Sequence, residues 1–148
     1  MIRVTVRTRA QSTYIAAMAQ LPPSIDDFER MAREAWAALP QELRDLAGDV
    51  LIRIEEIIDE ETARELEIDE PIELTGLYSG TDLTHASVMD PSPQQPMVVL
   101  YRLPILFEWI EHGDVDLAEL ISHVLVHEVG HHFGISDDHI DQLLEEAD

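Results

Sequence analysis

Residues 127–137 read His-Glu-Val-Gly-His-His-Phe-Gly-Ile-Ser-Asp, and this stretch decides how the rest of the chain is interpreted. On a helix, His127 and His131 lie one turn apart on the same face, so both imidazoles can reach one metal ion. Glu128 lies about 100° further round the helix axis, close to such an ion but free to act on a bound water. The spacing therefore predicts a helix that carries a catalytic metal centre.

A catalytic zinc ion typically takes three protein ligands and leaves its fourth position to water. Gly134 predicts a sharp turn with positive φ after the helix, which lets Asp137 return a carboxylate oxygen to the ion. His139 competes for this place, but it lies two residues beyond the expected return, so Asp137 is favoured. We therefore expect one zinc ion held by His127, His131 and Asp137.

Several other side chains are candidates for a role at this site. His123 lies one turn before His127 and could be a fourth ligand, but an array at positions i, i+4 and i+8 spreads too far for one ion, so a supporting or core role is favoured. His132 points away from the pair and is predicted to be structural. Asp138 either orients a ligating imidazole or is a solvated charge at a helix end. Tyr78 and Tyr101 are candidate donors to a tetrahedral oxyanion, or simply packed aromatic residues.

Composition narrows the class of protein. The 148 residues contain no cysteine, so any zinc must use nitrogen and oxygen ligands, and the absence fits a reducing, cytoplasmic location. The formal net charge is −22, and all nine basic residues are Arg. Such a field repels phosphate backbones, so we expect no nucleic-acid partner, and no apolar run is long enough for a membrane span. An acidic surface that keeps the protein soluble is the preferred explanation of the charge.

The first twenty residues differ from the rest of the chain. They contain Arg3, Arg7 and Arg9 and no acidic residue, whereas the remainder is strongly acidic. An export signal is disfavoured because the apolar run Tyr14–Ala19 is too short. We expect residues 1–20 to be a basic, flexible extension and residues 21–148 to form a single domain.

Hydrophobic spacing and turn residues predict an alternation of helices and strands. The expected helices span residues 24–38, 40–46, 107–112, 116–133 and 137–147. The expected strands span residues 50–55 and 97–101. The remaining predicted segments are a surface segment or short helix at 55–73, a turn-rich loop at 76–80 and an irregular excursion at 79–95. The strand at 97–101 is either a sheet edge, open to an extended peptide, or an interior strand.

The sequence also resembles a known family. Residues 127–137 resemble the H-E-x-x-H-x-x-G-x-x-H/D signature of metzincin-type metallopeptidases, and residues 24–146 resemble a small bacterial family of zincin-like metallopeptidases. The likeness rests on residues 76–80, 98–101 and 127–138. It implies an α+β fold: a minimal zincin-like domain with a small mixed sheet packed against helices and the active-site helix near the C-terminus. The site residues that it implies are the metal ligands His127, His131 and Asp137 and the catalytic base Glu128.

One departure from typical metzincins affects the expected activity. They carry a methionine turn beneath the metal, but no methionine follows Met97 in this chain. The cleft is therefore expected to be shallow, with little binding energy to position a peptide. We expect a zinc metallopeptidase of weak or narrow activity, which hydrolyses a peptide or protein substrate through a metal-activated water with Glu128 as general base. The alternatives are a non-hydrolytic metal- or peptide-binding module on a zincin scaffold and hydrolysis of a non-peptide amide.

Overall fold

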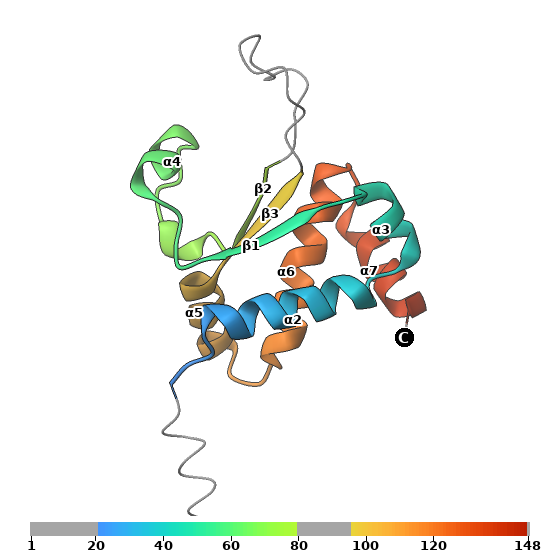
Figure 1. The fold of residues 1–148 in the computed structure, drawn as a ribbon, viewed down its shortest axis with the longest axis horizontal. Helices are drawn as coiled ribbons and strands as arrows, with labels where there is room; N and C mark the ends of the chain where they lie inside the picture. Colours follow the sequence, from blue (N-terminus) through green and yellow to red (C-terminus); the bar gives the residue numbers. More distant parts are fainter. Residues whose placement is uncertain (1–20, 80–95, 148) are drawn as a thin grey trace, which may run out of the picture.

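A computed structural model describes residues 21–79 and 96–147. The expectations for residues 1–20 and for most of the segment 79–95 therefore lie outside the described residues. The described part is a small mixed sheet with helices packed against it, which confirms the expected α+β architecture (Figure 1). In this part of the chain, no helix is both long enough and apolar enough to cross a membrane.

Within residues 21–79 and 96–147, the sheet has three strands in the order β1-β3-β2: β1 (Leu51–Glu55), β2 (Gly76–Ser79) and β3 (Met97–Tyr101). β1 runs parallel to β3, and β2 runs antiparallel to it. β3 is thus the central strand, and its residues 98–101 are all buried. Burial on both faces explains why this stretch is apolar throughout instead of alternating with polar residues. The interior interpretation of residues 97–101 is confirmed, and the edge interpretation is wrong.

The prediction of a turn-rich loop at 76–80 is wrong, because residues 76–79 form the strand β2. Leu77 lies opposite Val99 of β3, and Tyr78 lies opposite Val98. A four-residue segment that begins with Gly and ends with Ser reads as a turn, because these residues are depleted in strands. Pairing with the central strand, which is far away in sequence, overrides that local preference.

The described helices are α2 (Ile25–Ala38), α3 (Gln41–Ala47), α4 (Glu60–Glu65), α5 (Arg102–His112), α6 (Leu117–His132) and α7 (Asp137–Ala147), with a 3₁₀ turn, η1 (Pro71–Glu73). Most agree with the predicted ranges within a residue or two. The exception is α5, which begins five residues before the expected start at Phe107. The helix can begin before Pro104 because this proline lies in the first helical turn, where no backbone N–H is required.

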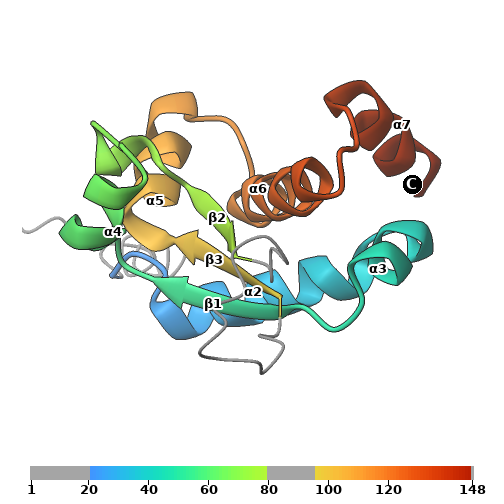
Figure 2. The ribbon, with the colours of Figure 1, turned by 90° about the horizontal axis from the view of Figure 1, so that it is seen from above.

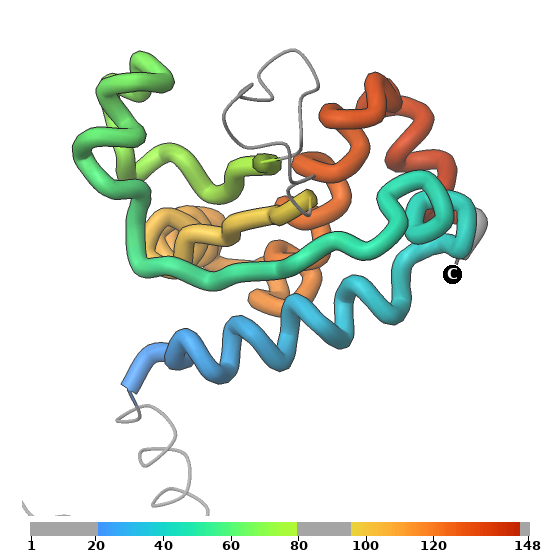
Figure 3. The backbone as a smooth tube through the Cα atoms, turned by 45° about the horizontal axis from the view of Figure 1, so that its top comes forward, coloured from blue at the N-terminus to red at the C-terminus, as the bar shows by residue number. Residues whose placement is uncertain are grey.

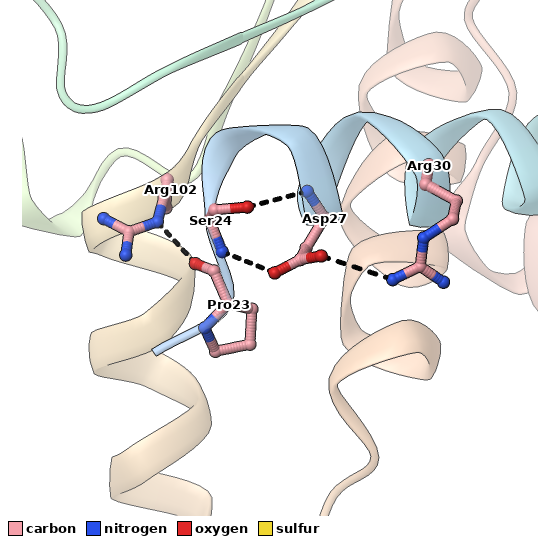
Figure 4. A network of polar contacts seen from close by, with 5 residues as sticks. All are labelled: Pro23, Ser24, Asp27, Arg30 and Arg102. Atoms are coloured by element: carbon pink, nitrogen blue, oxygen red, sulfur yellow. Dashed lines mark hydrogen bonds and ion pairs between the residues drawn. The ribbon is translucent and has the colours of Figure 1, made fainter. Parts of the chain in front are cut away.

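Two capping interactions fix the start of α2 (Figure 4). The Ser24 hydroxyl accepts a hydrogen bond from the Asp27 backbone N–H at 3.1 Å, and the Asp27 carboxylate accepts one from the Ser24 N–H at 2.8 Å. Arg30 lies 3.5 Å from the other oxygen of Asp27. The Arg102 guanidinium donates to the Pro23 carbonyl at 2.6 Å, which ties the start of α2 to the start of α5. The two reciprocal bonds between Ser24 and Asp27 form a capping box.

The larger core lies between one face of the sheet and the helices α2, α5 and α6 (Figure 2). It includes Phe28 of α2, Leu100 of β3 and Ile121 of α6, all of which are fully buried. A second cluster joins the end of α2 and α3 to α6 and α7, at the side of the molecule away from α4 (Figure 3). The third cluster covers the opposite face of the sheet with residues of and around α4. Helix α6 belongs to the first two clusters, so it is held on more than one side.

Tyr101 in the third cluster gives the fold a measurable pH dependence. Burial, and then the negative charges of Glu55 and Asp59, raise the pKa of Tyr101 to about 12. Between about pH 10 and 12 the unfolded chain loses this proton while the folded chain keeps it, so the free energy of unfolding falls as pH rises. We expect Tyr101→Phe to remove a slope of up to about 1.4 kcal/mol per pH unit. Urea unfolding of both proteins across this range checks the prediction, and parallel declines would contradict it.

Candidate metal centre

Burial along most of its length fixes the helix that carries the histidine pair. The Asp116 carboxylate caps α6 by accepting a hydrogen bond from the Ala118 N–H at 2.8 Å. The buried residues of α6 are Leu117, Leu120, Ile121, Val124, Leu125, Val126, Val129 and Gly130. With that surface in the core, the side chain of His127 is 18% exposed and that of His131 is 57% exposed. Their ring centroids lie 5.6 Å apart, so the expected adjacency of the two imidazoles is confirmed.

The chain reverses at the end of α6 through two backbone hydrogen bonds. The Ile135 N–H donates to the Gly130 carbonyl at 2.9 Å, and the Gly134 N–H donates to the His131 carbonyl at 3.1 Å. This pair of bonds is a Schellman motif, which requires a left-handed residue after the helix. Gly134 supplies it with a φ of +69°, so the predicted positive φ is confirmed.

The reversal leads directly into α7 and brings Asp137 back to the histidine pair. The Ser136 hydroxyl accepts a hydrogen bond from the His139 backbone N–H at 3.2 Å, and Asp137 is the first residue of the helix. One carboxylate oxygen, Oδ1 of Asp137, lies 3.0 Å from His127 Nδ1 and 2.6 Å from His131 Nε2. The three side chains that the sequence singled out therefore converge at one point.

The donor atoms of this group fit a divalent metal ion. In the described part of the chain, one ligand atom from each of His127, His131 and Asp137 lies within 4.8 Å of the other two. Hydrogen bonding from His131, and then from His127, lowers the pKa of Asp137, which favours the ionised carboxylate that a metal ligand must be. The Nε2 atom of His127 is buried and has no hydrogen-bond partner among the described residues. The His127 nitrogen that faces Asp137 is the other one, Nδ1, so the fit rests on the converging donor set itself: two imidazoles and one carboxylate suit zinc.

Glu128 lies on the neighbouring face of α6, against the edge strand β2. A Cβ atom on Gly76 would lie 3.0 Å from Glu128 Cγ, so the absence of a side chain at Gly76 makes room for this close approach. Burial raises the pKa of the Glu128 carboxyl, whereas the charge of His131 and a hydrogen bond donated by the Tyr78 backbone N–H lower it. The carboxylate is thus half-buried and held by backbone, which suits a group that takes up and releases a proton.

The two candidate tyrosines lie on opposite faces of the sheet. The Tyr78 ring stacks on His132 at the end of α6, with ring centroids 3.8 Å apart, so it lies on the face that α6 covers. Tyr101 packs instead with Ile58 and Val99 in the cluster on the other face. Because side chains alternate across a strand, Tyr101 cannot turn toward α6. The expectation that Tyr101 donates to an oxyanion at this site is therefore wrong, and the alternative holds: Tyr101 is a packed aromatic residue.

The remaining candidates lie around the group without joining it. The His123 ring lies 4.1 Å from the His127 ring, and burial lowers the pKa of His123. His139 and Asp138 are exposed residues in the first turn of α7, and neither belongs to the converging group. Geometry therefore favours Asp137 over His139 as the third ligand.

Two glycines with a structural role at the site were not identified from the sequence. Gly76 lies against Glu128, and Gly130 lies against Ile140 of α7. Neither reason is local: each depends on which residue another element brings into contact. Gly130 inside a helical pattern was the available signal, since an interior helical glycine usually has a packing reason.

The profile of the zincin-like metallopeptidase family matches residues 47–146, which run from the end of α3 to α7 and include the whole candidate site. No curated protein matches the chain.

Gly134→Ala tests the reversal that delivers Asp137. A Cβ at this position would meet nothing within 4 Å, so the cost is backbone strain alone. We expect the free energy of unfolding to fall by about 1–2 kcal/mol, the usual penalty for a left-handed residue with a Cβ. Gly134→Asn is the matched control, because Asn tolerates this conformation better, and it should lose less. Urea unfolding decides, and equal stability of Gly134→Ala and the wild type would contradict the role of the turn.

Proposed function

The chain belongs to the zincin-like metallopeptidase family, and on that premise we propose that it is a zinc-dependent peptidase with a minimal catalytic domain. The observation that carries the proposal is the convergence of His127 and His131 on one oxygen of Asp137. We assign these three residues as the ligands of one zinc ion and Glu128 as the general base. The metzincin-type form of the motif, with Asp137 in the third position, is part of the proposal.

The proposed ligands come from two helices. His127 and His131 are fixed by the buried helix α6, whereas Asp137 arrives on α7 after the turn at Gly134. Three protein ligands leave a fourth position of the ion for water or substrate. When bound, zinc supplies a Lewis acid that polarises a carbonyl group and lowers the pKa of water toward neutrality.

Glu128 is suited to the proton transfers of peptide hydrolysis. Its partial burial raises its pKa toward the working range of a general base, and the Tyr78 N–H holds the carboxylate beside β2. From this place Glu128 is proposed to accept a proton from the attacking water and to pass it to the leaving amine. Both transfers use the same carboxylate, so one variant at this position tests them together.

Zinc content and turnover of the full-length protein test the proposal. Elemental analysis is expected to find one zinc ion in the wild type and in Glu128→Gln, and a strong loss in His131→Ala and Asp137→Ala. Hydrolysis of a denatured, fluorescently labelled protein is expected to fall by about 10²–10⁴-fold in Glu128→Gln, the usual contribution of general acid–base catalysis.

Each contrary result has a distinct meaning. The same zinc content in the wild type, His131→Ala and Asp137→Ala would show that the ligand assignment is wrong. A Glu128→Gln variant that keeps zinc and all measurable function would favour the alternative, a binding module on a zincin scaffold.

A further inference from the structure

Helices α6 and α7 approach each other closely at Gly130, one residue before the second histidine of the pair. A Cβ atom at Gly130 would lie 2.3 Å from Cδ1 and 2.9 Å from Cγ1 of Ile140. Carbon atoms that are not bonded to each other pack about 3.5–4.0 Å apart, so a side chain here would collide with Ile140. Glycine at position 130 is therefore what lets α7 lie this close to α6.

Ile140 has little room to move away from such a collision. It is fully buried in the second cluster, where its neighbours include Leu39, Leu43 and Val126. Interiors packed at this density accommodate an added carbon by moving whole elements or by adopting strained rotamers. Of these neighbours, Leu39 and Leu43 precede residues 47–146, so part of this wall comes from outside the segment that matches the family.

The position of Asp137 depends on this contact at both ends of the connection. Ile140 follows Asp137 by three residues, or about one helical turn, so a shift of α7 at Ile140 carries the carboxylate with it. The hydrogen bond that closes the turn is accepted by the carbonyl of Gly130 itself. The side chain of Asp137 is 62% exposed, so little packing of its own holds it in place.

We propose that Gly130 and Ile140 are positioning residues: their contact docks α7 on α6 and holds Asp137 beside the histidine pair. This inference rests on the proposed function, since it takes Asp137 to be a zinc ligand. Residues that orient a metal ligand typically contribute 10–100-fold to metal affinity, which sets the size of the expected effect. The third ligand is then placed in advance by apolar packing, and zinc binding need not order it.

Zinc affinity of the full-length protein, measured with Zn²⁺ against a chromophoric chelator, tests this role. Gly130→Ala is expected to bind zinc about 10–100-fold more weakly than the wild type. Alanine is the better helix former, so without the collision this change would stabilise α6. The double variant Gly130→Ala/Ile140→Val lacks the Cδ1 atom of the 2.3 Å contact but keeps Cγ1, so it is expected to recover part of the affinity.

A core variant away from the site separates positioning from general loss of stability. Ile58 is 3% exposed and lies in the cluster on the opposite face of the sheet. Ile58→Ala should lower stability to urea while leaving zinc affinity within about twofold of the wild type, since it removes buried methyl groups without touching α7. If Ile58→Ala weakens zinc binding as much as Gly130→Ala does, the proposed role is wrong.

Other outcomes are equally decisive. Unchanged affinity in Gly130→Ala, or no recovery in the double variant, would overturn the inference and leave the proposed function intact. If Gly130→Ala does not fold, Ile140→Ala replaces it: this variant keeps the glycine but removes the anchor of α7, and unchanged affinity would again overturn the inference. A wild-type protein that binds no zinc would overturn the proposed function and this inference with it.

Discussion

The candidate site exists because the chain reverses within four residues after α6 and starts α7 with Asp137. The Schellman bonds at Gly130 and His131 set the direction of the turn, and the positive φ of Gly134 makes it possible. Only then can one oxygen of Asp137 reach ring nitrogens on two successive turns of α6. Without this reversal the histidine pair would be two neighbouring imidazoles on a buried helix.

The fold supplies rigidity to each part of the site from a different direction. The sheet and α2 pack against α6, so the two histidines are carried by a helix that the core fixes in place. Strand β2 holds Glu128 through a backbone hydrogen bond and the close approach at Gly76. Helix α3 and the end of α2 hold α7, and α7 holds Asp137. Because different elements hold Glu128 and Asp137, a substitution at one of these residues need not displace the other.

Local signals in the sequence predicted the parts of the site that depend on local physics. The spacing of His127 and His131, the turn at Gly134 and the start of α7 follow from helix geometry and capping, and the structure confirms each. Tertiary contacts could not be predicted in this way: β2 looked like a loop because its strand pairing comes from β3, about twenty residues later. The face of Tyr101 was equally hidden, because it depends on which residues of the central strand meet α6.

X-ray absorption at the zinc edge of the zinc-loaded, full-length protein tests the central claim most directly, because it reports the donors around the ion. The account predicts two imidazole nitrogens at about 2.0–2.1 Å and low-atomic-number oxygen donors at about 2.0–2.2 Å, with a total coordination number near four. A spectrum with three imidazoles would show that another histidine replaces Asp137, and one without paired imidazoles would contradict the site altogether.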